Sequence, residues 1–314
     1  MKHRIRNGLL HVLGAIGIVV ATEISAADTI RIATWNLNNL HFKTHQALRN
    51  GAPARSTHDY KTLGYYAARL KADVIALQEA NGPRAAKRVF PPNAFDLYFS
   101  GRHLEDTKQG RKSDRIYTGF AVRRGVFESV DKGDYQALSV KHDNRYRTRW
   151  GVSLTLRRDG RALHLLNVHL KSGCFTGALK RPRDANCATL ARQLRPLETW
   201  IDERAANGDA FVVLGDFNRA LDVHQDRDHF WQALNDGEPA ALSLYRYPFR
   251  KASACWQGTE RHHRNPIDFF VVDGSTFKRV VRNSFQQWRY QPGDRDITRG
   301  TPSDHCPASI DITW

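Results

Sequence analysis

The sequence predicts an α/β (α+β) domain in which two β-sheets pack face to face and helices cover their outer sides. Three observations favour this fold class. Short β-rich runs recur along the whole chain, segments with helical spacing are few, and only two of those segments are long. No internal repeat, low-complexity tract or interdomain linker divides the 314 residues. One large α/β domain accounts for that length.

The expected strands are short runs of β-branched and aromatic residues that end at polar or turn-forming residues. They cover residues 29–35, 73–77, 95–99, 117–122, 150–156, 162–166, 211–214, 267–272 and 308–314. Two long helices are expected over residues 58–70 and 187–206, with Pro196 kinking or splitting the second. A short helix is expected near 229–234, loops over 41–57 and 101–115, and irregular structure over 238–266.

The first 27 residues have the pattern of a secretory signal peptide. Lys2, Arg4 and Arg6 precede an apolar run over residues 8–21, and Ser25-Ala26-Ala27 supplies the small residues of a cleavage site. The apolar run is shorter than the roughly 20 residues that span a bilayer. We therefore expect an exported protein, periplasmic or extracellular. Its mature chain, residues 28–314, is expected to be a single domain without a membrane span.

Charge and cysteine content fit such a protein. The formal net charge of +16 predicts attraction to polyanions such as nucleic acid, or a basic surface without a specific partner. Four cysteines suit export, because disulfides persist outside the cytoplasm. The spacing favours a disulfide between Cys174 and Cys187, which leaves Cys255 to pair with Cys306. A zinc site or free thiols are the alternatives.

Polar side chains that can do chemistry stand beside the expected strands. They are Asn36, Glu79, His169, Asp216, Asn218, Asp268, Asp304 and His305. Each alone has an ordinary structural explanation, such as an Asx turn for Asp216 and Asn218. Together they offer oxygen ligands for a hard cation such as Mg²⁺ and histidines for acid–base catalysis near neutral pH. The set therefore predicts metal-assisted hydrolysis of a phosphoester.

The motifs that contain these residues occur in a definite order. They are Thr34-Trp35-Asn36, Leu77-Gln78-Glu79, Asn167-Val168-His169-Leu170, Gly215-Asp216-Phe217-Asn218, Ile267-Asp268 and Ser303-Asp304-His305. This set resembles the endonuclease/exonuclease/phosphatase superfamily, also called the DNase I-like family. The resemblance implies a four-layer α/β/β/α sandwich with two mostly antiparallel sheets. It also implies divalent-metal-dependent hydrolysis of phosphodiesters or phosphomonoesters.

The resemblance implies a role for each metal-binding and acid–base residue. Glu79 is expected to be the principal ligand of Mg²⁺ or Mn²⁺, with Asn36 beside it and Asp304 sharing the ion; an additional Ca²⁺ is left open. His305 is expected to be the general base, oriented by Asp268. Loss of Glu79, Asp216 or His305 should remove most turnover.

The remaining roles concern water and phosphate. By the same resemblance, Asp216 activates or orients the attacking water, and Asn218 holds a phosphate oxygen. His169 stabilises the transition state or acts toward the leaving group. Tyr117, in Tyr117-Thr-Gly-Phe, resembles a phosphate-contacting tyrosine of the family.

The basic charge favours a polymeric substrate. Clusters of Arg and Lys at residues 111–112, 145–149, 180–183 and 261–264 predict salt-sensitive contacts with a nucleic-acid backbone. We expect Lys171, Lys180, Arg181 and Arg183, which follow His169, to bind this backbone. The favoured function is a secreted nuclease acting on DNA or RNA. The alternatives are a hydrolase of lipid or small phosphoesters and a nucleic-acid-binding protein that has lost catalysis.

Overall fold

Each of two six-stranded sheets contains one parallel pair of strands near its centre. The computed structural model describes residues 29–111, 115–143, 146–239, 242–249, 265–296 and 300–314. In the first sheet β1 (Thr29–Leu40) runs parallel to β2 (Val74–Ala80). In the second sheet β9 (Arg161–His169) runs parallel to β10 (Phe211–Asp216). The other pairings between described strands of these sheets are antiparallel.

The remaining elements surround these central pairs. The other strands are β3 (Phe95–Phe99), β4 (Tyr117–Arg123), β5 (Ser129–Tyr135), β6 (Lys141–His142), β7 (Tyr146–Arg147), β8 (Gly151–Arg158), β11 (Leu244–Tyr247), β12 (Asp268–Asp273), β13 (Gln286–Gln287) and β14 (Ala308–Thr313). The α-helices are α1 (Thr57–Leu70), α2 (Pro83–Ala86), α3 (Arg102–Lys108), α4 (Ala185–Ala206), α5 (His229–Leu234) and α6 (Gly274–Arg279). The strand orders are β13-β14-β1-β2-β4-β3 and β11-β12-β10-β9-β8-β5, with β6-β7 as a separate ribbon.

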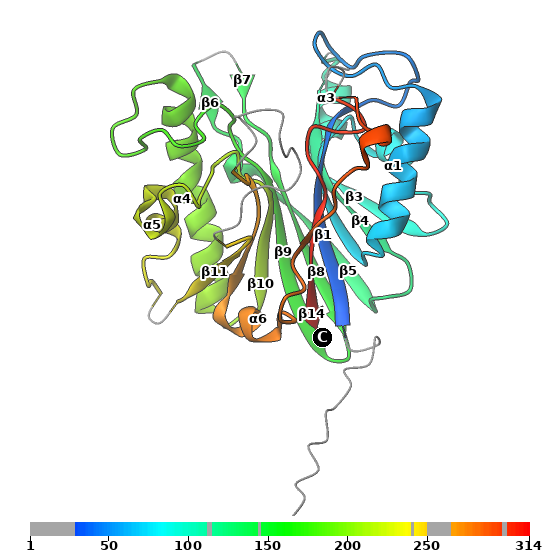
Figure 1. Ribbon diagram of the computed structural model, residues 1–314. Helices are drawn as coiled ribbons and strands as arrows, with labels where there is room; N and C mark the ends of the chain where they lie inside the picture. Colours follow the sequence, from blue (N-terminus) through cyan, green and yellow to red (C-terminus); the bar gives the residue numbers. More distant parts are fainter. Residues whose placement is uncertain (1–28, 112–114, 144–145, 240–241, 250–264, 297–299) are drawn as a thin grey trace, which may run out of the picture.

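The two sheets pack face to face, and helices cover their outer sides (Figure 1). Ile32 and Phe120 of the first sheet share a buried core with Leu154 and Leu214 of the second. Buried side chains of α1 pack on the outer side of the first sheet, and those of α4 and α5 on the outer side of the second. Apolar burial on both faces explains why the central strands are near-continuous hydrophobic runs. The predicted four-layer sandwich with mostly antiparallel sheets is confirmed.

Three local predictions differ from the structure. The expected loop over residues 101–115 contains α3, because the buried ion pair between Arg102 and Asp106 stabilises a segment whose sequence is mostly polar. The region 238–266 contains β11, which pairs with β12. The helix over 185–206 is continuous through Pro196, so of the two expected effects of this residue, a kink or a split, the split does not occur. β5 is an exposed edge strand that the sequence pattern did not indicate.

Two sequence predictions fall outside the described part of the chain. The predicted signal peptide occupies residues 1–27, and Cys255 belongs to the undescribed segment 250–264, so the second cysteine pair is not described. Within the described ranges, no helix has both the length and the apolar character needed to cross a membrane.

Candidate active site

Neighbouring strands bring three of the predicted residues side by side. The register of β10 places Asp216 beside His169 on β9 and beside Asp268 on β12. The close approach of β9 requires Gly215, whose φ is +133° and whose added Cβ would lie 2.1 Å from the carbonyl oxygen of Val168. A larger residue at this position would push the two strands apart. The glycine in the Gly-Asp-Phe-Asn motif therefore sets the spacing of the site.

A buried pair of amides joins the two sheets directly below these strand ends. Gln78 Nε2 donates to Asn167 Oδ1 at 2.8 Å, and Asn167 Nδ2 donates to the carbonyl oxygen of Leu77 at 2.9 Å. Both amide side chains are fully buried, where an unsatisfied polar group would be costly. Glu79 follows Gln78, and His169 lies two residues after Asn167. This bridge therefore fixes the position of Glu79 on the first sheet relative to His169 on the second.

The strand ends open into a cavity of about 450 Å³, which we call the central cavity. Seven predicted site residues are among its described lining: Glu79, His169, Asp216, Asn218, Asp268, Asp304 and His305. They come from positions as far apart as β2 and the segment before β14. A cavity that gathers carboxylates, imidazoles and amides from five chain segments is the arrangement expected of an active site.

An aspartate–histidine pair forms one wall of the central cavity. His305 Nδ1 lies 2.7 Å from Asp268 Oδ2, and His305 Nε2 lies 3.9 Å from Asp216 Oδ2. Burial alone would lower the pKa of His305, but the Asp268 carboxylate, together with Asp216 and Asp304, raises this pKa well above its usual value. The hydroxyl of Tyr290 donates to the carbonyl oxygen of His305 at 2.7 Å and holds its backbone in place.

Replacing Asp268 by asparagine is expected to move the acidic limb of the pH–kcat/KM profile to lower pH and to lower its maximum. Asp268 raises the pKa of His305, so without it His305 loses its proton at lower pH. The measurement is hydrolysis of a phosphodiester from about pH 5 to about pH 9, the range in which a perturbed histidine titrates. The exposed Asp131→Asn variant is the control. An unshifted limb in Asp268→Asn would contradict the assignment of His305 as the base.

Asp216 is held by two donors at the centre of the site. Asn36 Nδ2 donates to Asp216 Oδ2 at 3.0 Å, and the backbone N–H of Asn218 donates to Oδ1 at 2.8 Å. Burial raises the pKa of Asp216 to about 7, although His305 and both donors act in the opposite direction. The carboxylate is therefore fixed in orientation and can exchange a proton near neutral pH, which suits the positioning of an attacking water.

His169 lies between the two carboxylates of the central cavity. Its Nε2 is 3.6 Å from Glu79 Oε1 and 3.5 Å from Asp216 Oδ2. Burial, reinforced by Arg149 and His305, lowers the pKa of His169 well below its usual value. The imidazole is therefore neutral at physiological pH and acts as a hydrogen-bond donor rather than as a cation.

The donor atoms of the central cavity fit a hard divalent cation. Glu79, in a left-handed conformation with φ of 58°, accepts the backbone N–H of Asn39 at Oε2, and it lines the cavity together with Asp304. Carboxylate oxygens are the ligands that Mg²⁺ and Mn²⁺ prefer. Asn36, predicted as a further ligand, instead donates to Asp216 and is not among the described residues that line the cavity.

A second group of donors could also hold an ion. Ligand atoms of Asp216, Asp268 and His305 lie within 4.8 Å of one another. An ion bound by Nδ1 of His305 would replace the 2.7 Å hydrogen bond to Asp268. An ion bound at Glu79 instead would leave the hydrogen bond between His305 and Asp268 intact.

Two arginines of the site were not predicted as catalytic residues. Arg49 and Arg149 both line the central cavity. In the part of the chain that the structure describes, no carboxylate lies within ion-pair distance of either guanidinium. Glu79 and Asp216 act on the pKa of Arg149 through longer-range attraction, although burial lowers it overall. Arg149 belongs to the 145–149 cluster that was predicted to contact a nucleic-acid backbone, whereas nothing in the sequence separates Arg49 from the other members of a set of 48 Lys and Arg.

Five predicted residues lie away from the central cavity or face elsewhere. The hydroxyl of Tyr117 donates to Asp106 Oδ2 at 3.2 Å. Lys171 is 6% exposed and its Nζ donates to the carbonyl oxygen of Ser172. The other three are exposed and do not belong to the described lining of the cavity: Lys180, Arg181 and Arg183. Their predicted roles in substrate binding stay predictions.

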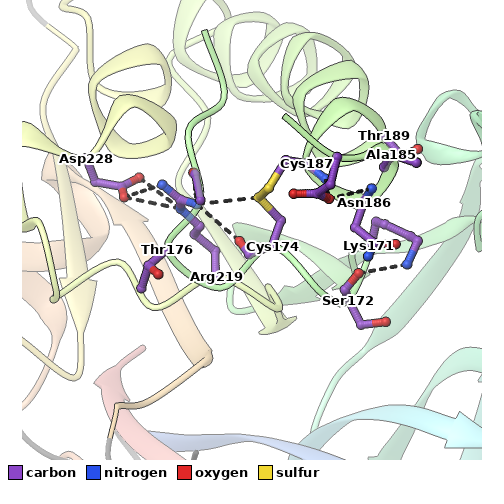
Figure 2. Close-up of a disulfide and its surroundings, with 12 residues drawn as sticks. Lys171, Ser172, Cys174, Thr176, Ala185, Asn186, Cys187, Thr189, Arg219 and Asp228 are labelled. Atoms are coloured by element: carbon purple, nitrogen blue, oxygen red, sulfur yellow. Dashed lines mark hydrogen bonds and ion pairs between the residues drawn. A yellow bond between two sulfur atoms is a disulfide. The ribbon is translucent and has the colours of Figure 1, made fainter. Parts of the chain in front are cut away.

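The disulfide between Cys174 and Cys187 is confirmed (Figure 2). Thr176, which lies within its loop, belongs to the described lining of the central cavity. Buried Arg219 donates to the carbonyl oxygen of Cys174 at 3.1 Å and pairs with Asp228 at 2.7 Å. Phe175, which is 46% exposed, lines the cavity from this segment. The disulfide and the arginine thus anchor a rigid segment beside the catalytic side chains.

Replacing both Cys174 and Cys187 by serine is expected to lower the free energy of unfolding by about 3 kcal/mol, the chain-entropy value for a loop of this length. The measurement is urea unfolding of the variant and of the wild-type protein under oxidising conditions. The Ser303-to-His305 side of the cavity does not depend on this loop, so metal-dependent activity should weaken without being lost. An unchanged free energy of unfolding would contradict the structural role of the bond.

The fold and the site define a hydrolase of phosphoester bonds. The chain belongs to the Endonuclease/Exonuclease/phosphatase family, whose family model matches residues 33–305. The predicted family resemblance is therefore confirmed. A search of curated protein sequences finds no match.

Several solved structures share this fold at low sequence identity. TDP2 from C. elegans is 17% identical with a TM-score of 0.57, covering 91% of this chain and 75% of its own. TDP2 from D. rerio complexed with single strand DNA product is 14% identical with a TM-score of 0.57, covering 91% and 99%. The mannosyl-6-phosphatase of Bacteroides thetaiotaomicron is 15% identical with a TM-score of 0.53, covering 91% and 100%.

Proposed function

We propose that the chain is an exported, divalent-metal-dependent nuclease that hydrolyses phosphodiester bonds of DNA or RNA. One observation carries the proposal. The Asp268–His305 pair and Asp216 line the central cavity together with Arg49 and Arg149, which have no carboxylate partner in the described chain. A general base, a water-positioning carboxylate and unpaired guanidinium groups are the parts needed to hold a phosphate and direct water at it.

Each residue of this chain has a defined task in the proposed reaction. His305, oriented by Asp268, takes the proton of a water that Asp216 positions. Arg49 and Arg149 bind phosphate oxygens, and neutral His169 donates a hydrogen bond to the phosphate as charge develops on it. A divalent cation held by Glu79 and Asp304 would, when bound, neutralise phosphate charge and make water more acidic.

Charge supports nucleic acid as the substrate. The net charge is +16, and the exposed Lys180, Arg181 and Arg183 lie in the disulfide-anchored segment that forms a rim of the central cavity. Contacts of this kind to phosphates bind a strand independently of sequence and weaken with salt. The similarity to a TDP2 bound to single strand DNA product agrees with this choice, and the similarity to a mannosyl-6-phosphatase makes a small phosphomonoester the alternative.

Export rests on two features of the chain. Residues 1–27 have the pattern of a signal peptide, and the Cys174–Cys187 disulfide suits an oxidising compartment. Expression of the full chain in a bacterium, followed by fractionation and N-terminal sequencing, is expected to yield protein that begins near Asp28 outside the cytoplasm. Uncleaved cytoplasmic protein would contradict the proposed location.

A substrate panel tests the proposed activity. Purified residues 28–314 are incubated with supercoiled plasmid, linear DNA, RNA, phospholipid vesicles and a sugar phosphate, each with Mg²⁺ and with EDTA. We expect Mg²⁺-dependent cleavage of nucleic acid that EDTA abolishes. Hydrolysis of the sugar phosphate or the phospholipid alone would replace the nuclease by one of the alternative functions, and nucleic-acid binding without any hydrolysis would indicate a binding protein.

A further inference from the structure

A second cavity of about 310 Å³ adjoins the central cavity, and we call it the side cavity. Its described lining comes from α3, the start of β4, β7 and the segment before β8. Figure 1 shows α3 and the β6–β7 ribbon at the same end of the molecule. Arg49, Arg149 and Ser172 line both cavities. A ligand whose reacting group lies in the central cavity can therefore extend into the side cavity past these residues.

The side cavity carries an excess of positive charge. Among the described residues that line it are five arginines and a single carboxylate, Asp106. That carboxylate already has partners, since Arg111 Nη1 lies 3.0 Å and Arg115 Nε 3.7 Å from its oxygens, and Tyr117 donates to it. The guanidinium of Arg102 is also satisfied, because it donates to Ser139 and to the carbonyl oxygen of Thr148.

Four arginines have donors left for an anion. One is Arg115, whose side chain makes no hydrogen bond within the described residues and contacts Asp106 only in the 3.7 Å ion pair. Arg49 and Arg149 have no carboxylate within ion-pair distance among the described residues. Within the same residues, the guanidinium of Arg147 donates only to the hydroxyl and carbonyl oxygens of Ser139. Gathering like charges around a cavity is unfavourable unless an anion enters it. Arginine also matches phosphate oxygens in geometry. The cavity is therefore built for a group such as phosphate.

The walls also offer surface for a base or sugar. Tyr146 is 47% exposed at the edge of the side cavity, and Trp150 and Ile116 contribute apolar lining. Exposed aromatic rings stack on bases in proteins that bind single strands. The volume lies within the roughly 300–1,000 Å³ of ligand pockets.

We propose that the side cavity is a subsite for the nucleotide next to the scissile phosphate, with Arg115 and Arg147 binding its phosphate and Tyr146 stacking on its base. The inference rests on the proposed nuclease function and adds that the enzyme acts on strands with a second phosphate beside the one it hydrolyses. The proposal thus distinguishes a polynucleotide substrate from an isolated phosphoester.

Kinetics on short substrates tests the subsite. The substrates are a dinucleotide with one internal phosphodiester, its 5′-phosphorylated form and its 3′-phosphorylated form. We expect wild-type protein with Mg²⁺ to hydrolyse one of the two phosphorylated forms with a kcat/KM about 10- to 100-fold higher than that for the unphosphorylated dinucleotide. This is the effect expected of charge-assisted hydrogen bonds to the added phosphate. In Arg115→Ala/Arg147→Ala this ratio should fall to about one, whereas the exposed pair Arg195→Ala/Arg227→Ala should keep it. Equal rates in wild type, or a ratio kept by the first variant, would overturn the proposal.

Binding separates this inference from the proposed function. Anisotropy of a labelled single-stranded oligonucleotide in EDTA is measured as a function of salt. Loss of one phosphate contact in Arg115→Ala/Arg147→Ala should flatten the slope of log K against log[salt] by about 0.7. If wild-type protein cleaves no nucleic acid, the nuclease proposal fails, and this slope alone decides the subsite: a flatter slope supports it and an equal slope overturns it. If the alanine variant fails to fold, Arg115→Gln/Arg147→Gln is measured in its place.

Discussion

Replacing His305 by alanine is expected to lower kcat on a phosphodiester by about 10²- to 10⁴-fold, the contribution of a positioned general base. His305 is the imidazole that Asp268 orients at 2.7 Å, and its Nε2 faces Asp216 across the central cavity. The alanine variant removes the only predicted base whose ring is held in this way among the described residues. KM should change little, because Arg49 and Arg149 still bind the phosphate.

The matched control is His58→Ala, an exposed histidine at the start of α1. Both variants should keep the wild-type far-ultraviolet circular dichroism and a cooperative thermal transition. The variant at position 58 should keep full activity. Near-wild-type turnover by well-folded His305→Ala would contradict the proposed mechanism, since the other described imidazole of the central cavity, His169, lies 3.5 Å and 3.6 Å from its nearest carboxylates and makes no hydrogen bond with either.

Replacing Glu79 by glutamine is expected to lower kcat by about 10²- to 10³-fold and to remove stabilisation by Mg²⁺. The change keeps the size of the side chain and its acceptor for the Asn39 N–H, but removes the charge that attracts a cation. Loss of several kcal/mol of transition-state stabilisation by the ion corresponds to that range of rates. Steady-state kinetics and the melting temperature with and without Mg²⁺ are the measurements.

Glu203→Gln is the control, because Glu203 is exposed on α4 and lies outside the described lining of the central cavity. Its melting temperature should rise with Mg²⁺ as that of the wild type does, since a bound ligand stabilises the folded state. A Glu79→Gln variant that keeps both the Mg²⁺-induced shift and the activity would remove Glu79 as a ligand. The alternative donors at Asp216, Asp268 and His305 would then hold the ion.

The residues that end buried strands could be predicted because each follows an apolar run. Phe211 to Leu214 leads into Asp216, and residues 162–166 lead into His169, so local pattern alone placed both side chains at strand ends. Their meeting in one cavity depends on the register of β9, β10 and β12 and on the Gln78–Asn167 bridge between the sheets. The residue types together predicted a shared phosphoester-hydrolysing site, and the family resemblance, which spans the chain, added a role for each residue.

The catalytic roles of the arginines could not be predicted, because they depend on what surrounds each side chain; the 145–149 cluster indicated only contacts with a nucleic-acid backbone. Arg149 and Arg219 are alike in sequence, yet Arg219 is paired with Asp228 and Arg149 has no carboxylate partner in the described chain. The helix α3 was not predicted for the same reason. Its polar residues are stabilised by ion pairs of Asp106 with Arg102, Arg111 and Arg115, which the local sequence pattern does not show. The surroundings also decide the place of Asn36, which was predicted as a metal ligand. In the structure its side-chain amide donates a hydrogen bond to Asp216.

The central claim is that this cavity directs water at the phosphorus of a nucleic-acid phosphodiester. Hydrolysis of an oligonucleotide in ¹⁸O-labelled water with Mg²⁺, followed by mass spectrometry of the products, tests it most directly. We predict that wild-type protein places ¹⁸O in the phosphate group of the product and that His305→Ala and EDTA abolish the reaction. Label in the sugar, or products without label, would contradict the account.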